Sequence, residues 1–122
     1  MLFNVDKCSV MHMGRGNKKF KYDIGGVAFR ASEEERDLGV IMHSSAKPSR
    51  QCVEAAKRAN RILGMIKRTI VSRELPEHDV VLRLYKSLVR SHLEYCIQAW
   101  SPYLRQDIDT LEQIQRRATK RI

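Results

Sequence analysis

The sequence predicts an α+β chain, with short antiparallel strands and a hairpin at its N-terminal end followed by a three-helix bundle. Over the first 45 residues, short apolar runs are separated by glycine-containing turns, a pattern typical of strands. From Pro48 onward, apolar residues recur every three or four positions, which is the period of one helix face. We therefore expect a β segment at residues 1–45 and a helical bundle at residues 46–122.

The clearest hairpin signal lies between residues 20 and 29. Residues 20–24 alternate apolar and polar side chains, and residues 27–29 continue the run. Between them, Gly25 and Gly26 can supply the positive φ angles that a two-residue turn requires. A hairpin with its turn at these glycines is predicted.

Other strands are predicted on either side of this hairpin. Residues 8–13 form a compact apolar run that ends at a glycine-rich loop. Residues 32–35 are interpreted as an acidic loop, and residues 38–42 as a further strand. Gly39 would lie inside that strand, where glycine is typical of a bulge or of a close approach by another backbone.

The first two predicted helices each carry an apolar face. The first begins at Pro48, which suits a first helical turn, and its apolar positions are Cys52, Ala56, Ala59, Leu63, Ile66 and Ile70. The second begins near residues 75–79 and either continues to Trp100 or bends near Arg90 and Ser91. Its apolar positions are Leu82, Tyr85, Val89, Leu93, Cys96 and Trp100.

A third helix is predicted after Ser101 and Pro102, which suit an N-cap and a first-turn position. Its apolar positions are Leu104, Ile108, Leu111, Ile114 and Ala118. The periodicity reaches Ile122 with no stop signal, so we expect the bundle to be truncated at its C-terminus.

Positive charge is concentrated in the helical part of the chain. Residues 1–45 hold seven Lys/Arg against six Asp/Glu, a net of +1, whereas residues 46–122 hold sixteen against eight, a net of +8. Such an excess favours a polyanionic partner, with a generic solvated basic surface as the alternative. No apolar stretch approaches the ~18 residues of a membrane span, so we expect no membrane association.

The spacing of the three cysteines argues against both a disulfide framework and a metal site. Cys8, Cys52 and Cys96 are far apart and odd in number, which favours a reducing intracellular compartment over a disulfide framework. No paired ligands of the Cys-x-x-Cys kind are present, so no metal site is predicted. Cys52 and Cys96 fall on apolar helix faces and are expected to be buried thiols.

Residues 84–102, LYKSLVRSHLEYCIQAWSP, resemble a segment of the reverse transcriptases of jockey-like non-LTR retrotransposons. Further segments resemble the same family and follow in its order, so that the likeness covers nearly the whole chain: residues 3–8, 35–40, 47–52, 59–66 and 111–117. The resemblance implies the end of the catalytic palm followed by the helical thumb. The family's Tyr/Phe-Ala-Asp-Asp strand pair is missing, and no Asp-Asp pair occurs anywhere in the chain.

The resemblance also implies where this chain would bind. Asp37, Leu38, Gly39 and Val40 are primer-grip-like residues, and Lys7 resembles a palm lysine near the phosphates of the incoming nucleotide, a proposed general acid. The thumb-like helices would hold an RNA/DNA template–primer duplex by phosphate contacts. Their candidate cations are Lys57, Arg58, Arg61, Lys67, Arg68, Arg83, Lys86, Arg90, Arg116, Arg117, Lys120 and Arg121.

The implied function is that of a fragment of an RNA-directed DNA polymerase, inactive alone because the catalytic aspartates lie outside it. In the intact family enzyme those aspartates bind divalent metal, typically Mg²⁺. This chain itself would hold no cofactor, would work with the remaining palm and fingers, and would act in the nucleus. The alternatives are a non-catalytic helical module that binds nucleic acid or protein, and an inert remnant of the element.

Overall fold

The computed structural model describes residues 2–73 and 78–120. The chain divides into two compact units, residues 1–48 and residues 49–122, each of which is described by itself. The first unit carries the strands and the second carries the helices, so the predicted α+β class is confirmed.

Three two-stranded sheets make up the first unit, after a short 3-10 turn, η1 (Val5–Lys7). The antiparallel hairpins are β2 (Asp23–Ile24) with β3 (Val27–Ala28), and β5 (Glu34–Asp37) with β6 (Val40–His43). The third pair, β1 (Ser9–Val10) with β4 (Arg30–Ala31), is parallel, so the prediction of antiparallel strands holds for two of these pairs.

Both hairpins close through two-residue turns of the same kind. Gly25 and Gly26 have φ angles of +60° and +84° between β2 and β3, which confirms the predicted glycine turn. Leu38 and Gly39 have φ angles of +47° and +83° between β5 and β6. Positive φ at both central positions defines the type I′ turn, whose twist matches that of the flanking strands.

The second turn corrects two predictions. Glu34 and Glu35, the second half of the predicted acidic loop at residues 32–35, belong to strand β5, and Gly39 lies in a turn and not inside a strand. Glutamates are poor strand formers, but here the four-residue register between β5 and β6 places them on an exposed strand. Cross-strand pairing therefore overrides the local preference of the sequence.

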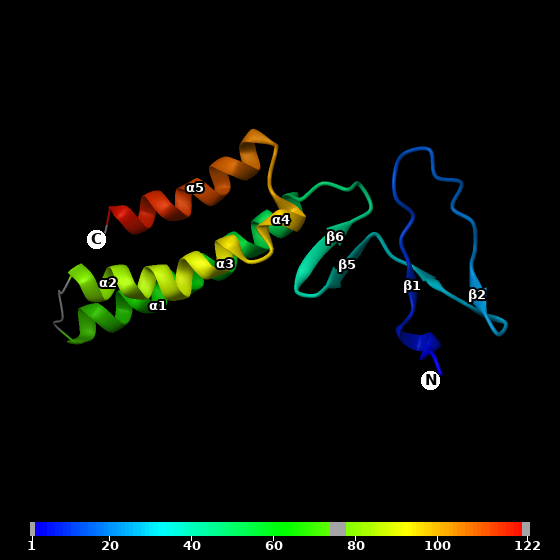
Figure 1. Ribbon diagram of the computed structural model, residues 1–122, viewed down its shortest axis with the longest axis horizontal. Coiled ribbons are helices and arrows are strands. Elements are labelled where there is room, and N and C mark those ends of the chain that lie inside the picture. The colour runs from blue at the N-terminus through cyan, green and yellow to red at the C-terminus, as the bar shows by residue number, and fades with distance from the viewer. Residues whose placement is uncertain (1, 74–77, 121–122) are drawn as a thin grey trace. The chain divides into compact units, whose positions relative to one another are not determined.

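In the second unit, α1 (Ser49–Arg73) is followed by one continuous helix made of α2 (His78–Leu84), a π-helical segment η2 (Tyr85–Val89) and α3 (Arg90–Glu94). The helical unit then continues with a short helix, α4 (Ile97–Trp100), and ends with α5 (Arg105–Thr119). The second helix runs back along α1, and α5 packs against α1 in the same direction as α1 (Figure 1). In the described part of the chain the helices number four, so the prediction of three is wrong.

The π-helical segment explains how the second helix keeps its apolar face. Tyr85, Val89 and Leu93 are spaced by four residues, and on an α-helix two such steps overshoot one face by roughly 80°. The backbone N–H of Arg90 donates to the carbonyl of Tyr85, five residues back, which is the wider π turn. That wider turn returns Val89 and Leu93 to the face that packs on α1.

The second helix ends earlier than predicted. Tyr95 leaves the helical conformation and Cys96 adopts a left-handed one, with φ of +51°, so the chain turns before α4. The change from π-helix to α-helix falls at Arg90, and Cys96 does not continue the apolar face. Trp100 is nevertheless buried, and its indole N–H donates to the carbonyl of Tyr95 at 2.7 Å.

The last helix starts three residues later than predicted. Leu104 is its N-cap residue and Arg105 its first helical residue, so neither Ser101 nor Pro102 has the predicted capping role. Asp107, in the first turn of α5, is buried and accepts a 2.7 Å hydrogen bond from the hydroxyl of Ser49, the first residue of α1. This side-chain contact joins the starts of α1 and α5.

One apolar core holds the helical unit together. It combines predicted positions from all three long helices: Ala56, Ala59, Leu63, Ile66, Val89, Leu93, Ile114 and Ala118. The predicted apolar faces of α1, of the second helix up to Leu93, and of α5 are therefore confirmed.

Candidate nucleic-acid interface

The cations of α1 lie mainly on its outer side. Lys57, Arg61 and Arg68 follow one another at helical spacing and are exposed, opposite the buried face of Ala59, Leu63 and Ile66. Lys57 is paired with Glu54 at 3.2 Å. Outside this row, Arg58 is half-buried and Lys67 is exposed beside an apolar hollow.

On the second helix, Arg83, Lys86 and Arg90 are all exposed, as predicted for a solvent-facing row. They do not have equal freedom to bind a partner. The guanidinium of Arg90 lies 2.6 Å from the carboxylate of Glu94, which raises the pKa of Arg90 and offsets its charge. Arg83 and Lys86 make no ion pair with any residue that the structure describes.

The cations of α5 lie near its C-terminal end. Arg116 is paired with Glu112 at 2.9 Å, and Lys120 is exposed. Arg117 reaches across to α1, where its guanidinium donates to the Asn60 side-chain oxygen at 3.3 Å. Arg121 lies outside the described residues.

The contact between Arg117 and Asn60 joins two of the predicted clusters. Lys57 and Arg61 lie three residues before and one residue after Asn60, and Lys67 lies two turns further along α1. Arg117 is therefore set among the α1 cations. No described contact joins the row on the second helix to them.

The carboxylates of the helical unit are already engaged. Each described Asp or Glu between residues 49 and 120 has a partner: Glu54 with Lys57, Asp79 with His78, Glu94 with Arg90, Asp107 with Ser49, Asp109 with Arg105, and Glu112 with Arg116. Of the predicted binding cations, eight make no ion pair with a described residue: Arg58, Arg61, Lys67, Arg68, Arg83, Lys86, Arg117 and Lys120. Uncompensated positive charge therefore lies on α1, the second helix and α5.

The four primer-grip-like residues lie at the end of one hairpin. Asp37 closes β5, Leu38 and Gly39 form the turn, and Val40 opens β6 opposite Asp37. Leu38 is 84% exposed, whereas Val40 is buried. The hairpin therefore exposes the apolar Leu38 side chain at its tip, whereas the buried Val40 side chain contributes to packing.

Lys7 ends the η1 turn and is exposed.

The Cys52 thiol near the start of α1 is buried, as predicted from the sequence. Cys52 is fully buried, and burial together with the nearby charge of Asp107 raises the pKa of its thiol to about 11. A thiol with that pKa is protonated at neutral pH and is a poor nucleophile. Within the described residues, no three His, Cys, Asp or Glu side chains are grouped so as to hold a metal ion.

The structure also contains an apolar hollow that sequence reasoning missed. It has a volume of about 260 Å³ and lies among α1, the second helix and α5, with Lys67 and Tyr85 on its wall. Its lining residues are separated by up to 55 positions in the chain, from Leu63 to Ala118, so no local sequence signal marks it.

The chain matches no known protein family, and no curated protein and no solved structure is significantly similar to it. Among the described residues, no helix is both long enough and apolar enough to cross a membrane.

Proposed function

We propose that this chain is the primer-grip and thumb portion of a non-LTR retrotransposon reverse transcriptase, and that it holds an RNA/DNA template–primer duplex by phosphate contacts. The observation that carries the proposal is the uncompensated charge of the helical unit. Every described carboxylate there has a partner, whereas eight predicted cations form no ion pair with an acidic residue that the structure describes. Phosphate groups are the complementary partner, because each cation that binds one releases a counterion.

This kind of binding suits a polymerase subunit. Contacts to phosphate fix the position of a duplex without reading its bases, and a polymerase must accept every sequence. On this proposal nucleotide addition belongs to metal-binding aspartates elsewhere in the enzyme, and the chain alone adds no nucleotides. The family likeness also leads us to propose a nuclear location.

A non-catalytic nucleic-acid-binding module is the alternative that the same charge supports. The protein-interaction alternative has less support, because its apolar helix faces are packed against one another in the core, including Ala59, Leu63, Val89 and Leu93.

The test is the affinity of the full chain for an RNA/DNA hybrid, measured against salt concentration. We expect the logarithm of the association constant to fall linearly with the logarithm of salt concentration. In the variant Arg61→Ala/Arg68→Ala/Arg117→Ala, each lost phosphate contact should reduce that slope by about 0.9. The double variant Arg83→Ala/Lys86→Ala tests the second helix in the same way.

The matched control is Lys47→Ala/Arg105→Ala, which removes two positive charges outside the predicted set. The salt dependence of this control should resemble that of the wild type. The slope should change less in the control than in Arg83→Ala/Lys86→Ala. Binding that is independent of salt, or equal loss in the control and in both test variants, would refute the proposal.

A further inference from the structure

The hollow among the three long helices has the composition of a ligand pocket. Leu63, Ile66 and Ile70 of α1, Val81 of α2 and Ala118 of α5 form its apolar wall. Its volume of about 260 Å³ exceeds the roughly 150 Å³ that suffices for benzene in a protein cavity. A phenyl ring with a short chain therefore fits inside.

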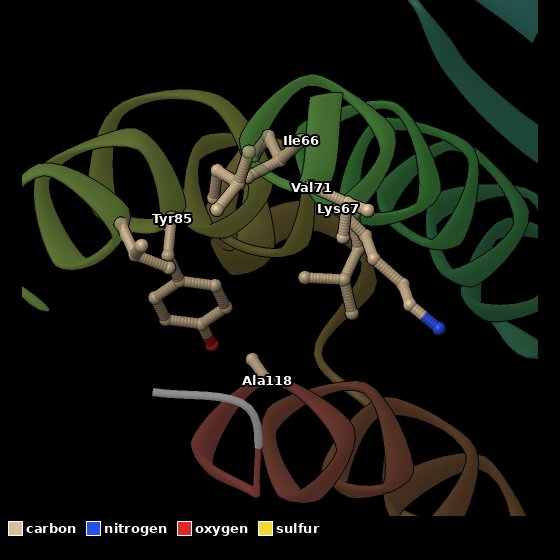
Figure 2. Close-up of a pocket in the computed structure, with 8 residues that line it drawn as sticks. Ile66, Lys67, Val71, Tyr85 and Ala118 are labelled. Carbon is tan, nitrogen blue, oxygen red and sulfur yellow. The ribbon is translucent and has the colours of Figure 1, made fainter. Parts of the chain in front are cut away.

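Two polar groups accompany this apolar wall, and both are hydrogen-bond donors. Figure 2 shows the hydroxyl of Tyr85 turned toward Ala118 across the pocket, and the ammonium of Lys67 directed outward from its wall. The Tyr85 hydroxyl forms no hydrogen bond with any described residue, and burial raises its pKa, so the group stays protonated. Lys67 forms no ion pair within the described residues.

Among the residues that the structure describes, the lining of the pocket includes no Asp or Glu that could compete for these donors. The other hollow of the helical unit differs in this respect. That hollow, of about 190 Å³, has Glu94 and Glu112 on its wall. An anion is therefore favoured in the first hollow, beside the ammonium of Lys67.

We propose that the pocket between α1, the second helix and α5 binds a small apolar carboxylate, with its aryl or alkyl body against Leu63, Ile66 and Ala118 and its carboxylate near Lys67 and Tyr85. The volume and apolar wall of the cavity favour a ligand with an apolar body of this size. The two hydrogen-bond donors favour an anionic group on that ligand. This site shares Lys67 with the proposed duplex-binding cations, but the two proposals are tested with different ligands and different variants, so either can fail without the other.

The experiment is a titration of the full chain with 4-phenylbutyrate, followed by ¹H–¹⁵N NMR. We expect saturable shifts of the amides at residues 63–71, 81–85 and 118, with a dissociation constant on the order of 1 mM. 4-Phenylbutan-1-ol, which has the same body without the charge, should bind at least about fivefold more weakly. Acetate, which has the charge without the body, should cause no saturable shift.

Two variants assign the binding to the pocket. Lys67→Met keeps the apolar stem and removes the charge, so it should reduce 4-phenylbutyrate affinity to that of the alcohol. Val81→Phe should fill the cavity and abolish binding of both compounds. Arg105→Met is the matched control, because it removes one charge at a point about 20 Å along α5 from Ala118 and should change neither affinity.

Other outcomes would overturn the proposal. They are no saturable shift, equal affinity for the acid and the alcohol, equal loss in Lys67→Met and Arg105→Met, or shifts around Leu93 and Leu111 in the second hollow. Shifts of the pocket amides on raising the protein concentration without ligand would instead assign the pocket to a second copy of the chain.

Discussion

Leu38 occupies a position that leucine ordinarily avoids. Its φ of +47° is the first of two positive values in the β5–β6 turn, and its side chain is 84% exposed. A left-handed backbone costs a non-glycine residue roughly 1–2 kcal/mol because Cβ crowds the following carbonyl oxygen. Leu38 thus makes the turn less stable than asparagine or glycine would.

Replacing Leu38 by Asn should therefore stabilise the β5–β6 hairpin by about 1 kcal/mol, since Asn-Gly is the preferred type I′ pair. Hydrogen exchange of the hairpin amides measures this, and protection should rise at Asp37 and Val40, the paired residues that flank the turn. The control is Gly39→Ala, which places a Cβ at the second positive φ and should lower protection. Reduced protection in Leu38→Asn would show that the leucine side chain itself stabilises the turn.

At the scale of elements, α1 and α5 depend on a hydrogen bond between their first turns. The Ser49 hydroxyl donates at 2.7 Å to the Asp107 carboxylate, which is only 2% exposed. A buried carboxylate that loses a donor retains the cost of its removal from water. This single contact therefore matters more than the exposed ion pairs, which contribute little each.

Ser49→Ala should destabilise the helical unit by about 1–3 kcal/mol, because it leaves Asp107 without this donor. Urea unfolding followed by circular dichroism at 222 nm measures the change. Ser91→Ala removes an exposed hydroxyl from the second helix and should change stability by less than about 0.5 kcal/mol. If the two variants proved equally stable, Asp107 would not depend on Ser49.

At the scale of the whole chain, alkaline pH is expected to weaken the helical unit. The Cys52 thiol has a pKa raised from 9.0 to about 11, so the folded state favours its neutral form. That stabilisation is complete below pH 9 and is lost as the pH rises from 9 to 11, because the unfolded chain deprotonates first. At pH 10, deprotonation of this thiol is expected to lower the free energy of unfolding by about 1 to 2 kcal/mol.

The stability of Cys52→Ala relative to the wild type isolates this contribution from that of the lysines and tyrosines. Urea midpoints at pH 7 and pH 10 should show that the wild type loses more stability than the variant. A difference between the two proteins that stays constant over this range would contradict the raised pKa of Cys52.

Much of the fold could be predicted because local chemistry and packing agree there. The apolar faces of α1 and α5 repeat at the helical period and are buried as predicted, and the Gly25-Gly26 turn has the geometry that only glycine adopts freely. Candidate cations could also be recognised, since lysine and arginine at helical spacing on the polar side must face solvent.

The remaining features depend on distant residues. The Leu38-Gly39 turn and the β5 strand follow from cross-strand pairing, which overrides the local preferences of leucine and glutamate. The π-helical segment and the end of the second helix at Tyr95 follow from packing against α1. The contact between Arg117 and Asn60 also depends on tertiary packing, because the two residues are 57 positions apart in the chain.

By itself the sequence determined the α+β class, the buried faces of the long helices and the excess of positive charge in the helical part, because each depends on composition or on a local period. Only the tertiary structure decided how Asp107 is held by Ser49, and that three helices leave an apolar pocket beside Lys67 and Tyr85. Those features require side chains far apart in the chain to meet, and packing brings them together without leaving a local signal.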